Sequence, residues 1–189
     1  MELCTTDAVR ISIMFATKEL GKKLLSERDD FIQRTSPFDR SARMKTSQPV
    51  SEEEFLAFIG RNTLDWDESE KAMISEAFQG VKASLDKLRL PIEDKIQIIK
   101  TTGKEEGNAA YTRGNAIVFP SMMFSLPVEN IRKTLCHELF HIISRKNPDL
   151  KEELYKVIGF KRCPEVCLPG ELLDRRVTNP DAPVNDHYI

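Results

Sequence analysis

The feature that most constrains this chain is an HExxH sequence, residues 137–141, set inside a stretch with helical periodicity. Apolar residues recur there with spacings of three and four, the pattern of one buried helix face. They are Ile131, Leu135, Leu139, Ile142 and Ile143. Ser125 and Pro127 suit a helix start, because a hydroxyl can cap it and proline fits its first turn. Asn147-Pro148 suits its end, so the sequence predicts one helix between these signals.

The two histidines of the motif are spaced to bind one metal ion. On a helix, His137 and His141 project from the same face, within reach of a single ion. Glu138 lies about 100° further round the helix, where its carboxylate can reach a water on the metal. A zinc ion lowers the pKa of its water to roughly 7, and a nearby carboxylate can then take the proton. The motif therefore predicts a Zn²⁺ site with His137 and His141 as ligands and Glu138 as general base.

An accidental motif in a helical protein without metal is the alternative. Two observations weigh against it. The chain has only 3 histidines, and two of them stand at ligand spacing around a glutamate. The motif also lies on an otherwise apolar helix, where polar groups without partners are costly to bury.

Composition and charge exclude several classes of function. Of 189 residues, 40% are hydrophobic and 31% are charged, as in ordinary globular proteins. The net charge of -2 gives no electrostatic reason to bind nucleic acid or an anionic membrane. No stretch approaches the ~18 apolar residues that a membrane span needs. Residues 1–7 lack the basic start of a secretory signal, so we expect a cytoplasmic protein.

The cysteines fit that compartment as reduced thiols. Cys163 and Cys167 form a C-x3-C pair, which could in principle bind metal. A structural zinc site requires four ligands, however, and no second Cys or His pair is spare. We therefore predict no separate structural zinc site.

The first fifty residues look like an N-terminal appendage and connection. Val9, Ile11, Ile13 and Phe15 alternate with Arg10, Ser12 and Met14, which suits a strand or the start of a helix. Thr17 can cap a short helix through Leu25, and Ser26 with Asp29 starts another. Residues 35–50 contain a turn and then lack periodicity, which predicts an extended connection.

Residues 51–189 have the signals of one α+β domain. Capping boxes at 51–54 and 67–70 begin two helices, the second about five turns long. Two β-branched runs follow, in residues 92–101 and 116–119, and predict a small sheet. After the motif helix, a further helix extends from 147 to 158 and ends at a glycine.

A strand followed by an HExxH helix resembles the zincin metallopeptidases. Residues 108–119 are similar to the edge strand that precedes the active-site helix in thermolysin-like enzymes. The resemblance implies that a substrate backbone pairs along Asn108, Ala109, Ala110 and Tyr111. From the residues alone, an ordinary hairpin turn at 108–111 is equally compatible.

Departures from the zincin patterns narrow the class and leave the third metal ligand open. Ser144 and Asn147 stand where metzincins have glycine and histidine, so the resemblance is to gluzincins, whose third ligand is a later carboxylate. Glu171 follows Pro169-Gly170, which suits the start of a short helix, and is the preferred candidate. Glu165 is the second candidate, and the reserves are Asp174 and Asp181.

The sequence thus predicts a zinc-dependent endopeptidase that acts on a peptide or protein substrate. Glu138 would activate the water and then protonate the leaving amine. Tyr111, His187 and Tyr188 are candidates to stabilise the oxyanion. A catalytically inactive zincin-like regulatory or interaction module is the alternative.

The C-terminal end of the sequence has two further features. Residues 178–183 are similar to a stretch of bacterial HExxH proteins. Residues 184–189 look like a strand that has just begun, which leaves open a chain that continues beyond Ile189.

Overall fold

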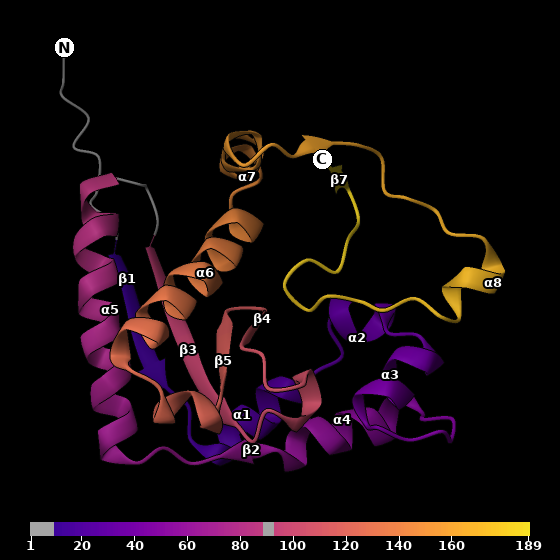
Figure 1. The fold of residues 1–189 in the computed structure, drawn as a ribbon, viewed down its shortest axis with the longest axis horizontal. Coiled ribbons are helices and arrows are strands. Elements are labelled where there is room, and N and C mark those ends of the chain that lie inside the picture. Colours follow the sequence, from indigo (N-terminus) through magenta and orange to yellow (C-terminus); the bar gives the residue numbers. More distant parts are fainter. Residues whose placement is uncertain (1–9, 89–92) are drawn as a thin grey trace.

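The computed structural model describes residues 10–88 and 93–189 and has an α+β fold with a mixed five-stranded sheet (Figure 1). Its strands are β1 (Arg10–Phe15), β2 (Thr63–Leu64), β3 (Glu93–Thr101), β4 (Tyr111–Arg113) and β5 (Ala116–Pro120). The order is β1-β3-β5-β4, with β2 paired to β3. β1 and β5 are parallel to β3, whereas β4 is antiparallel to β5. β4 is therefore an edge strand. The resemblance placed a single edge strand in residues 108–119, whereas the structure divides this stretch into β4 and the internal strand β5, with residues 108–110 outside both.

Eight α-helices and two 3₁₀ turns connect or cover the strands in the described part of the chain. The helices are α1 (Lys18–Leu25), α2 (Asp30–Arg34), α3 (Pro37–Arg43), α4 (Glu52–Arg61), α5 (Glu68–Leu88), α6 (Val128–Lys146), α7 (Pro148–Val157) and α8 (Gly170–Leu173). The 3₁₀ turns are η1 (Lys104–Glu106) and η2 (Ser121–Ser125), and β6 (Lys161–Arg162) pairs with β7 (His187–Tyr188) in a small second sheet. None of these helices is long and apolar enough to cross a membrane.

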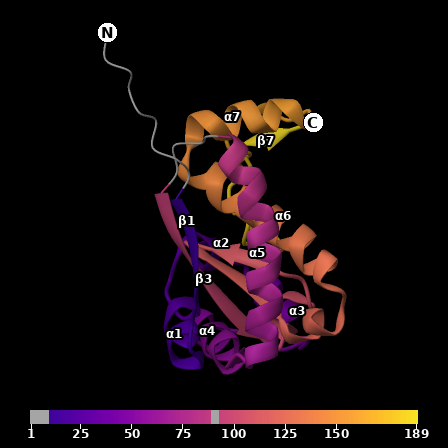
Figure 2. The ribbon, with the colours of Figure 1, turned by 90° about the vertical axis from the view of Figure 1, so that its left-hand side faces the viewer.

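Side-chain alternation along the strands divides the interior into two cores. Ile117 and Phe119 of β5 face α5 and α6, which lie side by side on one side of the sheet (Figure 2). The intervening Val118 faces the opposite core, which α1, α2 and α4 cover. This is the period of two expected for a strand buried on both faces.

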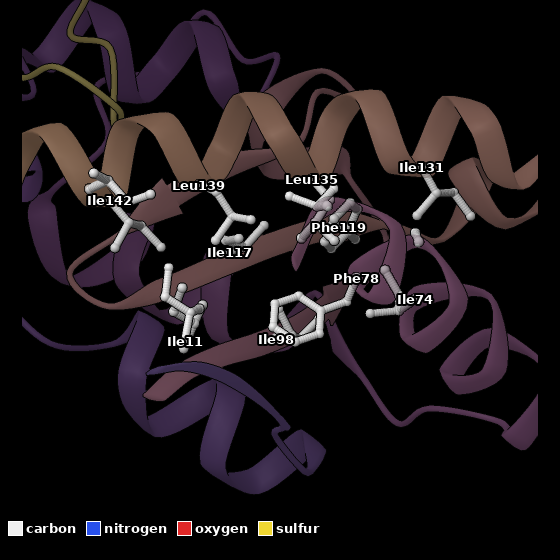
Figure 3. Close-up of a cluster of buried hydrophobic side chains, with 14 residues drawn as sticks. Ile11, Ile74, Phe78, Ile98, Ile117, Phe119, Ile131, Leu135, Leu139 and Ile142 are labelled. Carbon is white, nitrogen blue, oxygen red and sulfur yellow. The ribbon is translucent and has the colours of Figure 1, made fainter. Parts of the chain in front are cut away.

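The predicted apolar stripe holds α6 against the sheet. Ile131, Leu135, Leu139 and Ile142 are at most 1% exposed and project toward β5 and α5 (Figure 3). This face fixes how α6 is rotated about its axis. The HExxH residues consequently lie along the edge of this buried helix face, on the side toward β4.

The helix starts agree with the sequence at two capping boxes and differ at α6. Ser51 and Glu54 form the predicted box at α4. At α5, the Glu70 amide donates to Asp67 Oδ1 at 2.8 Å, and the Asp67 amide donates back to Glu70 Oε2 at 3.0 Å. The prediction that Ser125 caps α6 was wrong. Ser125 ends the 3₁₀ turn η2, and α6 begins after Pro127 without a side-chain cap.

The N-terminal fifty residues also differ from the expected loop. The prediction of an extended connection was wrong for residues 37–43, which form α3 with Ser36 as its cap and Pro37 in its first turn. Asp29, rather than Ser26, caps α2. Of the two alternatives for residues 9–15, a strand or the start of a helix, the structure has a strand, β1, and Val9 lies outside the described residues.

Residues 10–50 share the sheet and the second core with the remainder of the chain. β1 pairs with β3 along its whole length, and Phe31 of α2 packs in the same cluster as Phe55 of α4. The predicted boundary after residue 50 therefore crosses a continuous core.

Candidate metal centre

The two histidines of the motif face each other at the surface of α6. Their Nε2 atoms are 3.0 Å apart, and their ring centroids are 4.7 Å apart. Two nitrogen ligands each about 2.0–2.1 Å from a tetrahedral zinc lie about 3.4 Å from each other. His137 and His141 are thus arranged to bind one ion between them.

Glu138 is almost wholly buried beside this pair. Glu138 is only 3% exposed, and its Oε2 atom has no hydrogen-bond partner among the described residues. Burial, and then the nearby carboxylate of Asp181, raise the pKa of Glu138 to about 8. A buried oxygen without a partner is costly, and a cation at the histidine pair would favour its ionised form. The donor set therefore fits a metal ion.

A second carboxylate, that of Asp181, reaches His141 and Glu138 from the C-terminal part of the chain. Glu138, His141 and Asp181 each offer one ligand atom, and these atoms lie within 4.8 Å of one another. Asp181 Oδ1 accepts hydrogen bonds from the backbone amide of Thr112 at 2.6 Å and from its hydroxyl at 2.8 Å. Thr112 thereby holds Asp181 at the edge strand β4. Asp181 was only a reserve candidate in the sequence.

The two preferred candidates lie elsewhere. Glu171 is exposed on α8, which Figure 1 shows far from α6. Glu165 forms an ion pair with Arg34 of α2, with Nη2 3.3 Å from Oε2. Asp174 is exposed at the end of α8. The short helix was correctly predicted, but neither it nor Glu165 contributes to the group of ligand atoms at His141.

We call residues 176–187 the strap, because this segment returns from α8 across β4 to the end of α7 (Figure 1). Arg145, one helical turn after His141, holds the centre of the strap. Its guanidinium donates to Gly114 O at 3.0 Å, to the Thr112 hydroxyl, and to Asp181 O at 3.3 Å. One side chain of α6 thus binds both the edge strand and the strap.

Helices α2 and α3 hold the start of the strap. The Thr178 amide donates to Asp39 Oδ2 at 2.9 Å, and its hydroxyl donates to Arg34 O at 2.8 Å. Arg43 Nη2 donates to Thr178 O at 2.7 Å and also pairs with Asp39. The position of Asp181 consequently depends on the N-terminal helices.

The predicted substrate-binding residues are divided between the cleft and the core. Asn108 and Ala109 are exposed, and Ala110 is half-buried beside the site. The prediction of Tyr111 as oxyanion stabiliser was wrong, because its side chain points into the second core and its hydroxyl donates to Glu105 Oε1 at 3.4 Å. Only its backbone can face a substrate.

Two cavities meet at His137. The first, which we call the aromatic cavity, has a volume of about 600 Å³ and extends past His141 under α7 and the strap. The second, the methionine cavity, has about 470 Å³ and extends toward η2, with Met122, Met123 and Ala110 in its wall. A chain that passes over the histidine pair would therefore find a hollow on each side.

Of the remaining oxyanion candidates, His187 borders the site. It lines the aromatic cavity together with both motif histidines. Its Nδ1 lies 2.6 Å from Asp186 Oδ1, which fixes the ring. Tyr188 is 52% exposed and does not line that cavity.

Sequence reasoning missed the residues that position the site. Arg145 was visible only as a cation in the last turn of a helix, although its spacing of four from His141 places both on one face. Thr112 carried no signal, since its role depends on the path of the strap. Asp181 lies in residues 178–183, and the resemblance noted for that segment from the sequence was the available hint.

Comparison with known proteins assigns no family to this arrangement. No protein-family model, curated protein or solved structure matches the chain. The interpretation of the site therefore depends on its own geometry and chemistry.

Proposed function

We propose that the chain is a zinc-dependent endopeptidase with a zincin-like active site. His137, His141 and Asp181 would hold the metal, and Glu138 would be the general base. The observation that carries the proposal is the approach of Asp181 to His141 and Glu138. Its carboxylate would join the two histidines as the third protein ligand that catalytic zinc sites typically use. The edge strand β4 beside α6 supports the zincin-like interpretation of the fold.

The chemistry assigns the proton transfers to Glu138. Bound zinc would supply a Lewis acid for the substrate carbonyl and a water of lowered pKa. Glu138 would take one proton from the attacking water, whose oxygen would bond to the carbonyl carbon. The same carboxyl would then give the proton to the amide nitrogen as the C–N bond breaks. His187, held by Asp186 and lining the same cavity as both motif histidines, would donate a hydrogen bond to the oxyanion.

The free cysteines support the cytoplasm as the place of action. Cys136, Cys163 and Cys167 form no disulfide in the described residues. Reduced thiols are the rule in that compartment.

Metal analysis and turnover test the proposal together. The purified chain should bind about one zinc, and changing both His137 and His141 to Ala should abolish it. Glu138→Gln should keep the metal and lower hydrolysis of a peptide pool by roughly 10²- to 10⁴-fold, because the amide cannot accept the proton. Cys163→Ser with Cys167→Ser is the control and should leave zinc unchanged.

The outcomes separate the alternatives. Full zinc stoichiometry in the double histidine variant would contradict the site. Zinc at the site without any turnover would favour the catalytically inactive regulatory or interaction module.

A further inference from the structure

The edge strand offers a substrate only a short backbone to pair with. β4 has 3 residues, and the outward amide of its central residue, Thr112, is bonded to Asp181. Backbone pairing gives affinity without reading sequence, whereas pockets for side chains give specificity. With so little free edge, side-chain contacts must carry a large part of recognition. Of the two cavities beside His137, the aromatic cavity borders both motif histidines and is where those contacts can form.

The aromatic cavity has a wall of mutually packed rings. Tyr155 of α7 stacks on Phe140 of α6, with centroids 5.9 Å apart and an interplanar angle of 7°. Phe160 and His187 contact the same ring at centroid distances of 5.7 Å and 4.5 Å. Ile158 adds an aliphatic surface. Rings prefer offset or edge-to-face partners at such distances, so this wall favours an aromatic guest.

The charged groups of the cavity already have partners. Lys151 Nζ lies 3.3 Å from Asp186 Oδ1 and 5.2 Å from the centre of the Tyr155 ring. Asp186 also accepts from His187. Partial burial alone would raise the pKa of Asp186, but the contacts with His187 and Lys151 lower it. A charged substrate side chain would lose its hydration in the cavity and would find no unpaired charge to bind, because these charged groups already have partners. Such burial is unfavourable.

The strap contributes further residues to the wall of the cavity. Ala182 and Val184 line the cavity, and Ala182 directly follows the proposed ligand Asp181. The small side chain of Ala182 leaves space beside the histidine pair. The same segment therefore shapes both the metal centre and the cavity next to it.

We propose that the aromatic cavity is the specificity pocket of the enzyme and selects substrates with a bulky aromatic residue beside the scissile bond. Ile158, Phe160 and Ala182 determine this preference. The inference rests on the peptidase function proposed above and adds the class of substrate to it.

Cleavage of a peptide library tests the preference directly. The zinc-loaded wild type is given peptides randomised on both sides of a central bond, and products are identified by mass spectrometry. One flanking position should be enriched in Phe, Tyr or Trp. In matched peptides, kcat/KM for Phe should exceed that for Leu by about twofold to tenfold and that for Ala by more. Asp and Lys at this position should be poor.

Variants separate the pocket from the catalytic groups. Ala182→Phe fills the cavity and should lower kcat/KM for the Phe peptide far more than for the Ala peptide. Ile158→Ala should weaken the preference, and its matched control is Val157→Ala, because Val157 is the preceding residue and is 84% exposed. Unaltered selectivity in both Ala182→Phe and Ile158→Ala would overturn the assignment.

A binding measurement keeps the pocket testable without turnover. The zinc-loaded chain is titrated with acetyl-phenylalanine amide and acetyl-alanine amide, and the methyl resonances of Ile158 are followed by NMR. Only the Phe amide should shift them, and Ala182→Phe should abolish the shift. Binding without cleavage supports the pocket while contradicting the peptidase function. Cleavage without an aromatic preference contradicts the pocket alone, and neither cleavage nor binding contradicts both.

Discussion

At the scale of single residues, local sequence signals and the folded structure favour different residues as the third metal ligand. Asp181→Ala should lower zinc affinity by far more than the 10- to 100-fold typical of a residue that only orients a ligand. Glu171→Ala and Glu165→Ala should leave it unchanged, since Glu171 is exposed on α8 and Glu165 is paired with Arg34. Competition with a chromogenic chelator measures all three. An equal loss in Glu171→Ala would restore the sequence-based choice.

Thr112 gives a second test at this scale. Its hydroxyl donates to Asp181 and accepts from Arg145, so Thr112→Val removes both contacts while keeping the shape of the side chain. We expect zinc affinity to fall about 10- to 100-fold. Thr112→Ser keeps the hydroxyl and is the matched control. The same chelator competition applies, and equal affinity in the two variants would show that the backbone amide suffices to hold Asp181.

These residues also mark how far the sequence could predict the site. His137, Glu138 and His141 were predictable because a helix fixes their relation within one turn. Asp181 lies forty residues after His141 in the sequence, and its approach depends on where the strap runs. Glu171 had the better local signal, a helix start, but local signals say nothing about where a helix packs.

At the scale of elements, two serines that each cap a helix differ in their contacts outside that helix. Ser36 caps α3 and also donates to Arg176 O of the strap at 2.8 Å, whereas Ser51 caps only α4. Ser36→Ala and Ser51→Ala should each cost about 0.5–2 kcal/mol of stability in urea denaturation. Only Ser36→Ala should also weaken zinc binding, because it loosens the strap. Equal zinc affinity in both would contradict the anchoring role.

The elements themselves were largely predictable where local chemistry is strong. The capping boxes at Ser51 and Asp67 gave the starts of α4 and α5, and β-branched runs gave β3 and β5. α3 was missed although Ser36, Pro37 and Asp39 carry a helix-start pattern, because the basic and polar residues around it suggested a loop. Its side chains bond to the strap and to Glu106 of η1, and these contacts are tertiary and distant in the sequence.

At the scale of the whole molecule, a buried acid makes stability depend on pH. Burial raises the pKa of Glu106 to about 7, although the adjacent Arg43 opposes the shift. The folded state therefore holds this proton more tightly than the unfolded state. The stability that the proton contributes is fully present below about pH 4.5 and is lost as the pH rises through about 7.

We expect the free energy of unfolding to fall by about 1–3 kcal/mol between pH 5 and pH 8 because of this group. Glu106→Gln cannot ionise, so its stability should vary less over the same range. Urea denaturation of both proteins at several pH values isolates the contribution as their difference. Parallel pH profiles would mean that Arg43 keeps Glu106 ionised throughout.

The attachment of the strap to both β4 and the N-terminal helices has a consequence for local opening. The amides of Thr112 and Thr178 donate to Asp181 and Asp39, so both become free to exchange with solvent whenever the strap lifts. Opening of this kind needs less free energy than global unfolding, and a ligand that binds only the closed form suppresses it. Zinc should therefore slow hydrogen exchange at these two amides together, while the amide of Ile117 in the central strands changes little. If zinc slowed hydrogen exchange at the Thr112 amide but not at the Thr178 amide, the two ends of the strap would open independently.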